Sequence, residues 1–116
     1  VADDAQQAKE ARAAIEAGDI FIPATVLLEA EWVLRAGYNL TPARIAAVLR
    51  ALPGLPGITV EGPALLATAL DWMEGGMDFA DAMHLARSGA CDAFLSFDRK
   101  LAKAAAGRTP VPVEHP

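Results

Sequence analysis

The sequence has few of the residues on which several classes of protein depend. It contains one cysteine, Cys91, so it can form no internal disulfide, and it has no cysteine and histidine cluster of the kind that binds zinc. No uninterrupted apolar stretch approaches the roughly 20 residues that a membrane span needs, and no signal sequence opens the chain. These absences favour a soluble protein in a reducing, cytoplasmic environment.

Basic and aromatic residues are also scarce. Ten lysines and arginines stand against 15 acidic residues, which gives a formal net charge of −5, and aromatic residues make up 6% of the chain. An acidic protein does not hold nucleic acid on a broad basic face, so any contact with RNA or DNA must be local and bridged by metal. Because 53% of the 116 residues are hydrophobic, mostly alanine and leucine, we expect one helix-rich domain over residues 1–116.

Short apolar segments alternate along the chain with segments of helical periodicity. The pattern predicts strands at residues 20–22, 58–60 and 93–97, and an edge strand at 111–113. It predicts helices at residues 4–17, 24–36, 42–52, 63–74, 78–88 and 100–106, the third of them opened by Thr41 and Pro42. Short buried strands that alternate with helices are typical of a parallel sheet covered on both faces, so the predicted fold class is α/β.

Four acidic residues fall at one edge of this predicted sheet. Asp98 follows the third strand, Asp78 and Asp81 lie in the first turn of their helix, and Glu29 lies two turns after the strand that ends before Pro23. The carboxyl ends of parallel strands and the amino ends of the following helices share the edge where ligands usually bind. Crowded carboxylates raise one another's pKa unless a divalent cation neutralises them, and oxygen ligands favour Mg²⁺ or Mn²⁺ over zinc.

Each of the three aspartates also has an ordinary structural interpretation. Asp78 fits the N-cap of its helix, with Asp81 at the third helical position, and Asp98 fits the N-cap of the helix near Lys100. Taken alone, capping is the better interpretation for each of them. The functional interpretation therefore depends on the acids converging around one ion.

The helix predicted at residues 24–36 carries two glutamates, which helix geometry separates. The expected apolar stripe consists of Val26, Leu27, Ala30, Val33 and Leu34. Glu29 borders this stripe, whereas Glu31 shares its side of the helix with Arg35, so Glu29 is the better candidate for an inward carboxylate. A solvated charge at the border of the stripe is the alternative interpretation of Glu29.

Other residues give weaker signals. Arg99, Lys100 and Lys103 could hold the phosphates of a nucleic acid, although a solvated helix face is the usual interpretation of such a run. His84 lies one turn after Asp81, and a lone histidine is more often structural. The chain has no P-loop, no dinucleotide-binding glycine motif and no convincing Ser/His/Asp arrangement, which argues against nucleotide-dependent and acyl-transfer chemistry.

Three segments, in this order, carry a resemblance to a known family. They are VLLEAEWVLR at residues 26–35, DFADAMHLA at residues 78–86 and DAFLSFDRKLAKAA at residues 92–105. Together they resemble PIN-domain proteins, specifically the VapC-like ribonuclease toxins of bacterial toxin–antitoxin pairs. The resemblance implies a three-layer sandwich and a single-stranded RNA endonuclease that uses Mg²⁺ or Mn²⁺, is restrained by an antitoxin and forms a homodimer.

The resemblance also implies which residues carry the chemistry. Position by position, the family's metal-binding and catalytic acids fall on Glu29, Asp81 and Asp98, with Asp78 as an auxiliary metal ligand. Ser96 stands where the family often has a serine or threonine, and there it would orient a water molecule or a metal ligand. The implied reaction is attack of a metal-activated water on a phosphodiester.

The chain departs from the family at its start. The family begins with a strand and an aspartate, whereas this sequence opens on VADD, in which Asp3 and Asp4 resemble the cap of the first helix. In this fold that strand would lie centrally, between the strands at Ile20 and Ala93, so we expect two unpaired inner edges. Either residues that precede Val1 in the gene product supply the strand, which we favour, or a partner or a second copy does.

Two alternatives to the nuclease toxin stay open at this point. One is a catalytically silent PIN-like module, in which the acids only cap helices and the apolar helices hold a partner protein. The other is a PIN nuclease that acts in RNA processing without an antitoxin. The sequence does not indicate the RNA target, because base recognition depends on geometry that a single chain does not display.

Overall fold

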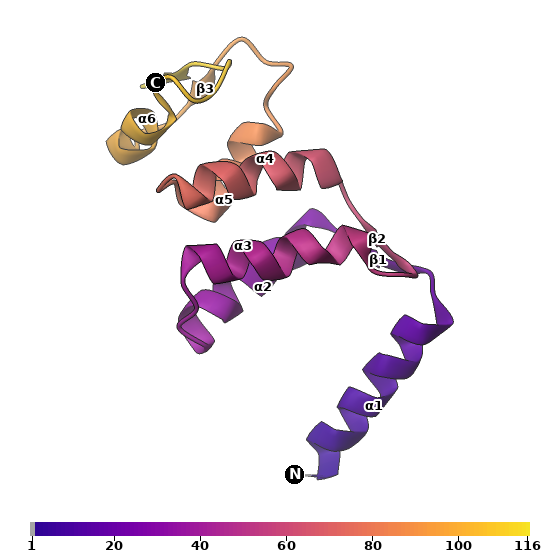
Figure 1. The fold of residues 1–116 in the computed structure, drawn as a ribbon. Helices are drawn as coiled ribbons and strands as arrows, with labels where there is room; N and C mark the ends of the chain where they lie inside the picture. Colours follow the sequence, from indigo (N-terminus) through magenta and orange to yellow (C-terminus); the bar gives the residue numbers. More distant parts are fainter. Residues whose placement is uncertain (1) are drawn as a thin grey trace.

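The computed structural model describes the backbone of residues 2–116, together with the side chains of residues 5–14 and 16–116. In chain order the elements are α1 (Ala2–Ala17), β1 (Ile20–Ile22), α2 (Ala24–Trp32), the π-helix η1 (Val33–Gly37), α3 (Pro42–Ala51), the 3₁₀ helix η2 (Leu52–Gly54), β2 (Ile58–Val60), α4 (Pro63–Glu74), α5 (Phe79–Ala86), β3 (Phe94–Leu95), α6 (Arg99–Ala105) and β4 (Val113–Glu114) (Figure 1). Parallel strands alternate with helices, so the α/β class predicted from the sequence is confirmed.

The strands form two separate parallel pairs. β1 pairs with β2 in the register Ile20 to Ile58, and β3 pairs with β4 in the register Phe94 to Val113. Within residues 2–116 no strand joins the two pairs, so these residues form two two-stranded sheets instead of the continuous sheet expected for this fold class.

The C-terminal strands are shorter than predicted or shifted. The strand expected at residues 93–97 is reduced to Phe94–Leu95, and the edge strand expected at 111–113 is found at Val113–Glu114. Pro112 has no N–H to donate, but its carbonyl accepts the N–H of Phe94 at 2.8 Å. Proline can therefore adjoin this edge as an acceptor, while the paired strand starts only after it.

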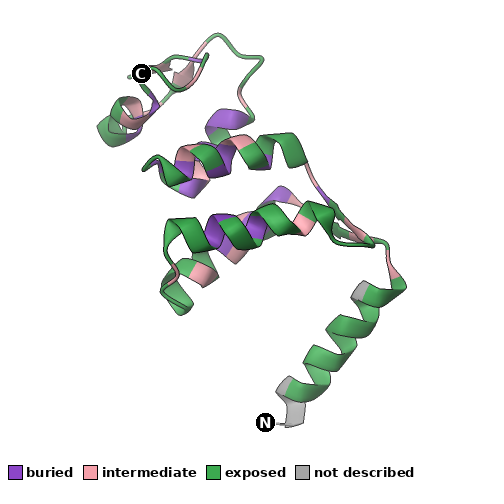
Figure 2. Ribbon diagram, viewed as in Figure 1, coloured by how far each residue is buried: buried purple, intermediate pink, exposed green. Residues whose placement is uncertain are grey.

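Helices α2 to α6 pack around one hydrophobic core. Figure 1 shows α2 and α3 beside β1 and β2, with α4 stacked along α3 and α5 packed against α4. The buried surfaces of α3, α4 and α5 face one another, as the purple segments of Figure 2 show. The largest fully buried side chains are those of Leu27, Ile45, Leu49, Leu66, Leu70, Phe79, Met83 and Leu85. This core holds the amino end of α5 in place, and with it the candidate site.

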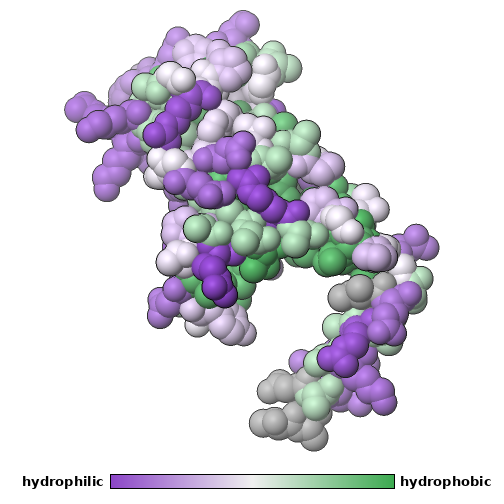
Figure 3. Space-filling view, viewed as in Figure 1, coloured by the Kyte–Doolittle hydropathy of each residue, from purple (hydrophilic) through white to green (hydrophobic). Residues whose placement is uncertain are grey.

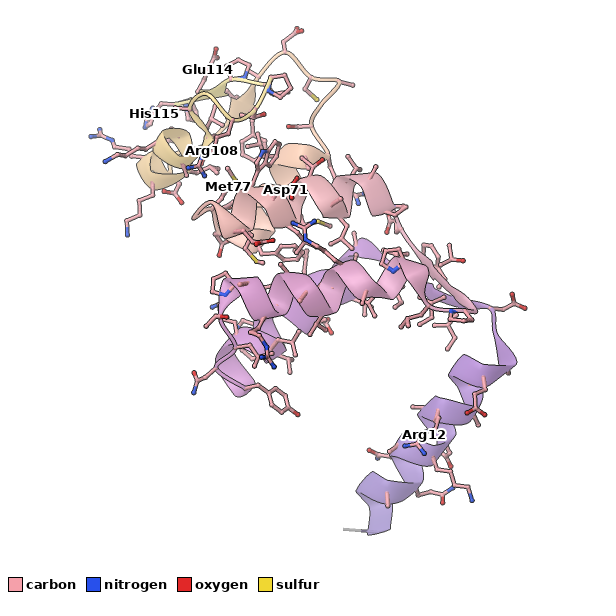
Figure 4. All side chains as sticks on the ribbon, in the orientation of Figure 1. Arg12, Asp71, Met77, Arg108, Glu114 and His115 are labelled. Atoms are coloured by element: carbon pink, nitrogen blue, oxygen red, sulfur yellow. The ribbon has the colours of Figure 1, made fainter. Side chains whose placement is uncertain are left out.

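Helix α1 projects away from this core. All of its described side chains are exposed, and Arg12 extends into solvent (Figure 4). The radius of gyration, 16.2 Å, exceeds the value of about 13 Å expected for a compact chain of this length because of this projection. Figure 3 shows exposed apolar side chains on the face of the body that turns toward α1. The expectation that Asp3 and Asp4 cap α1 concerns side chains outside the described part of the chain.

The helix predicted over residues 24–36 changes form partway along. It is α-helical only to Trp32 and continues as the π-helix η1 to Gly37.

None of the helices in the described residues is both long and apolar enough to cross a membrane.

Candidate active site

Two aspartates are placed by the sharp turn that leads into α5. Gly76 takes a positive φ of 110°, which favours glycine, and Met77 and Phe79 on either side of Asp78 are buried. Asp78 then caps α5, since its Oδ2 accepts the N–H of Asp81 at 3.2 Å. The predicted capping roles of Asp78 and Asp81 are thus confirmed, and both carboxylates are held at the amino end of a helix with a buried face.

A third aspartate reaches the same region from the other strand pair. Asp98 follows β3 and caps α6, because its Oδ1 accepts the N–H groups of Lys100 at 2.9 Å and Leu101 at 3.3 Å. Ser96 accepts the N–H of Asp98 through its Oγ at 3.0 Å, so this serine fixes the loop that presents the aspartate. Both cap bonds use one carboxylate oxygen, and Oδ2 of Asp98 remains for another partner.

The three aspartates line one hollow between α5 and α6. Its volume is about 170 Å³, and its wall also contains Gly76, Met77, Lys100, Leu101 and Ala104. Figure 4 shows Met77 at the end of α4 that faces α6. Segments about 20 residues apart in the sequence therefore bring their carboxylates to one place.

The electrostatics of this hollow are unfavourable for Asp81. Its partial burial raises the pKa of its carboxyl, and the negative charges of Asp78 and Asp98 raise it further, while His84 opposes them. A carboxylate that the fold both desolvates and surrounds with like charge is typical of a functional site, because a purely structural cap would avoid that repulsion.

Glu29 does not lie in this hollow. Its side chain is exposed on α2, whereas Glu31 is buried, with 5% of its surface exposed. The prediction that Glu29, rather than Glu31, is the inward glutamate is therefore wrong. The physical reason is that α2 meets the core along Ala24, Leu27 and Glu31, while Val26 and Val33 of the expected stripe are exposed.

The expected convergence of Glu29 with Asp81 and Asp98 is accordingly not seen. Across residues 2–116, apart from the side chains that the structure leaves undescribed, no group of three or more acidic, histidine or cysteine side chains is arranged to hold a metal ion. The chemistry of the hollow nevertheless suits Mg²⁺ or Mn²⁺, since proteins usually hold such ions by one or two carboxylates, waters and substrate phosphate. Asp81 and Asp98 supply two carboxylates.

Sequence reasoning missed the ion pair of Glu31 with Arg35. Nε of Arg35 donates to Oε2 of Glu31 at 2.8 Å, and this hydrogen bond is the main reason that the pKa of Arg35 is raised. The spacing of four residues between an acid and a following arginine is the signal that could have found it. The pair explains how a glutamate tolerates a buried position.

A second missed residue is Glu61, directly after β2. Its Oε1 accepts the N–H of Ala24 at 2.8 Å and its Oε2 accepts Arg87 at 3.3 Å, so Glu61 caps α2 from a distant strand. The hydrogen bond from Ala24 is the main cause that lowers the pKa of Glu61. With His84 and Arg87 it lines a separate hollow of about 410 Å³.

The predicted basic residues are placed on α6. Arg99, Lys100 and Lys103 are all exposed there, and Lys100 is the member of this group that lines the aspartate hollow. A positive charge beside three carboxylates is compatible with phosphate binding at the rim of the hollow.

Comparison with protein families identifies the class to which the chain belongs. The family model described as PIN domain matches residues 1–107, so the chain is a member of the PIN domain family. PIN domains are generally nucleases, a class of hydrolases, and they usually use divalent metals. Membership of this family implies an RNA substrate. Searches of curated proteins and of solved structures found no match for this chain.

Proposed function

We propose that the protein is a divalent-metal-dependent endoribonuclease, and that it is the VapC-like toxin of a bacterial toxin–antitoxin pair. The observation that carries the nuclease proposal is the hollow that Asp78, Asp81 and Asp98 line together. The fold presents these carboxylates from two segments at a cost, because the charges of Asp78 and Asp98 raise the pKa of Asp81. A divalent cation would remove that cost.

Asp81 and Asp98 are the residues that would hold Mg²⁺ or Mn²⁺, with Asp78 beside them. The bound ion would supply a water of lowered pKa and would polarise a phosphodiester oxygen. Asp98 is oriented for this role, since its cap hydrogen bonds use Oδ1 and leave Oδ2 free. Ser96 holds the backbone of Asp98, and Lys100 lies where it can contact a substrate phosphate.

Glu29 belongs to the proposal on the resemblance alone. Its position in VLLEAEWVLR matches the family's second acid, and its side chain is exposed on α2. Among the described residues, β1 and β3 each pair with one strand only. We propose that a further strand joins the two pairs when the protein is active and completes the acidic site.

The toxin assignment rests on the three resembling segments. An acidic hollow suits a basic side chain of an antitoxin, which would compete with the metal for the same carboxylates. Exposed apolar side chains at Trp32, Tyr38 and Phe97 offer surface for an antitoxin or for a second copy of the chain. A PIN nuclease without an antitoxin would share the hollow and lack such a partner.

A cleavage assay tests the nuclease proposal. A pool of fluorescently labelled single-stranded RNA is incubated with the protein and Mn²⁺, with EDTA as the metal-free control. We expect Asp81→Asn to abolish cleavage without unfolding the chain. Asp71→Asn is the matched control, since Asp71 lies outside the hollow and pairs with Arg50 at 2.7 Å. Undiminished cleavage by Asp81→Asn would remove that acid from the mechanism, and no cleavage by the wild type would favour the silent module.

A further inference from the structure

The ion pair of Glu31 and Arg35 has a role beyond stabilising the fold. The side chain of Glu31 is 7% exposed, whereas the side chain of Arg35 is 51% exposed, so a buried carboxylate holds a guanidinium at the surface. Replacing a buried ion pair by apolar residues is often neutral or stabilising, so stability alone does not account for it. The pair fixes where the positive charge of Arg35 stands.

The backbone around Arg35 is also unusual. Arg35 lies in η1, the π-helix that follows α2. π-Helical turns are rare, and they occur frequently at functional sites because the wider turn redirects the side chains it carries. Here the π-helix begins at Val33, directly after Trp32, and Arg35 within it pairs with Glu31 at 2.8 Å.

Arg35 lies beside the aspartate hollow. A second hollow of about 290 Å³ is lined by Glu31 and Arg35 on one side and by residues 76–79 on the other. Residues 76–78 line both hollows, so the two lie on either side of one short turn. The charge of Asp78 contributes to the raised pKa of Arg35, which agrees with their closeness.

Among the described residues, Arg50 is neutralised more fully than Arg35. Nη2 of Arg50 contacts both Asp71 at 2.7 Å and Glu74 at 2.9 Å, two carboxylates for one guanidinium. Arg35 makes hydrogen bonds through Nε and Nη2 to Glu31 alone, and a guanidinium has five N–H donors. Arg35 therefore retains donors for a planar, bidentate partner such as phosphate.

We propose that Arg35 binds a phosphate of the RNA strand next to the aspartate hollow, and that Glu31 is its positioning residue. The inference rests on the proposed nuclease function and adds to it a contact for the nucleotides that flank the cut. A protein with a net charge of −5 must hold RNA through few, well-placed cations. Arg35 is such a cation, at the rim of the site and on the opposite side of the turn from Lys100.

Salt-dependent binding tests the inference. A fluorescein-labelled single-stranded RNA 12-mer of mixed sequence is titrated in EDTA, which prevents metal-dependent cleavage, at a series of KCl concentrations. The test variant is the double substitution Glu31→Gln with Arg35→Ala, which leaves no unpaired buried charge. We expect its Kd to rise about fivefold and the slope of log K against log salt to fall by about 0.7, the value for one lost contact to a single strand. Arg50→Ala, the control, should leave both the Kd and the salt slope at their wild-type values.

Two further variants separate charge from orientation. Arg35→Lys should keep the salt slope, since it keeps the charge, and Glu31→Gln alone should weaken binding about twofold without changing the slope. If the wild type binds and cleaves RNA while the double variant keeps the wild-type Kd and slope, this inference fails and the nuclease stands. If the wild type neither binds nor cleaves the RNA, both fail.

Discussion

Asp98 has two roles that two substitutions separate. Its Oδ1 accepts the N–H groups of Lys100 and Leu101 as the N-cap of α6, and its carboxylate lines the hollow with Asp81. Asparagine is as good an N-cap as aspartate but carries no charge, whereas alanine caps poorly. Asp98→Asn should therefore lose the metal-binding carboxylate and keep the cap of α6, whereas Asp98→Ala should lose the carboxylate and the cap.

The magnitudes follow from these contacts. Loss of the cap in Asp98→Ala costs about 1 kcal/mol, which lowers Tm by about 4 °C for a domain of this size. Asp98→Asn should keep Tm within about 1 °C of the wild type, because its cap is retained. Both variants should lose at least about 100-fold in Mn²⁺-dependent cleavage, equivalent to about 2.7 kcal/mol of transition-state stabilisation.

The assay combines thermal unfolding, followed by circular dichroism, with cleavage of the single-stranded RNA pool. Asp71→Asn again serves as the control at an acid that lies outside the hollow. If Asp98→Asn cleaves RNA as fast as the wild type, the carboxylate of Asp98 is a cap and nothing more. If Asp98→Asn unfolds like Asp98→Ala, the loss of activity reports stability and the reasoning from the hollow is refuted.

The remaining predictions concern the stability of the fold around Asp81. At neutral pH and without metal, Asp81→Asn should be more stable than the wild type and should unfold at a higher Tm, because it removes the desolvated charge and its repulsion from Asp78 and Asp98. The difference in stability between the two proteins should depend on pH, because the pKa of Asp81 is higher in the folded state than in the unfolded state. The stability that this group contributes is present below its unfolded pKa of about 3.9 and is lost as the pH rises through its folded pKa. The two proteins should therefore unfold together near pH 3 and separate as the pH rises, and a gap in Tm that does not change with pH would contradict this origin.

Local signals predicted the parts of this structure that depend on a few neighbouring residues. Thr41 caps α3 through a hydrogen bond from the N–H of Arg44 at 3.3 Å, as the Thr-Pro pair indicates. Asp78 and Asp98 cap their helices as expected. The apolar run at Ile20–Ile22 forms the predicted strand, but the expectation that this strand is buried is wrong, since Phe21 is 57% exposed and the two isoleucines are only partly buried.

Features set by packing were not predictable in the same way. Which glutamate of α2 is buried depends on how that helix meets the core and on the π-turn after Trp32, neither of which its periodicity encodes. The cap that Glu61 gives to Ala24 links residues 37 apart in sequence, so no local pattern announces it. The predicted helix at residues 4–17 exists, yet its periodicity does not reveal that its described side chains contact solvent rather than the sheet.

Binding of Mn²⁺ is the measurement that tests the central claim most directly, and it requires no knowledge of the RNA target. Free Mn²⁺ is followed by electron paramagnetic resonance while the protein is titrated. If Asp81 and Asp98 share a divalent cation, the wild type and Asp71→Asn bind Mn²⁺ alike, and Asp81→Asn and Asp98→Asn each weaken binding at least about tenfold. Equal affinity in all four proteins, or no binding by any of them, would contradict the account.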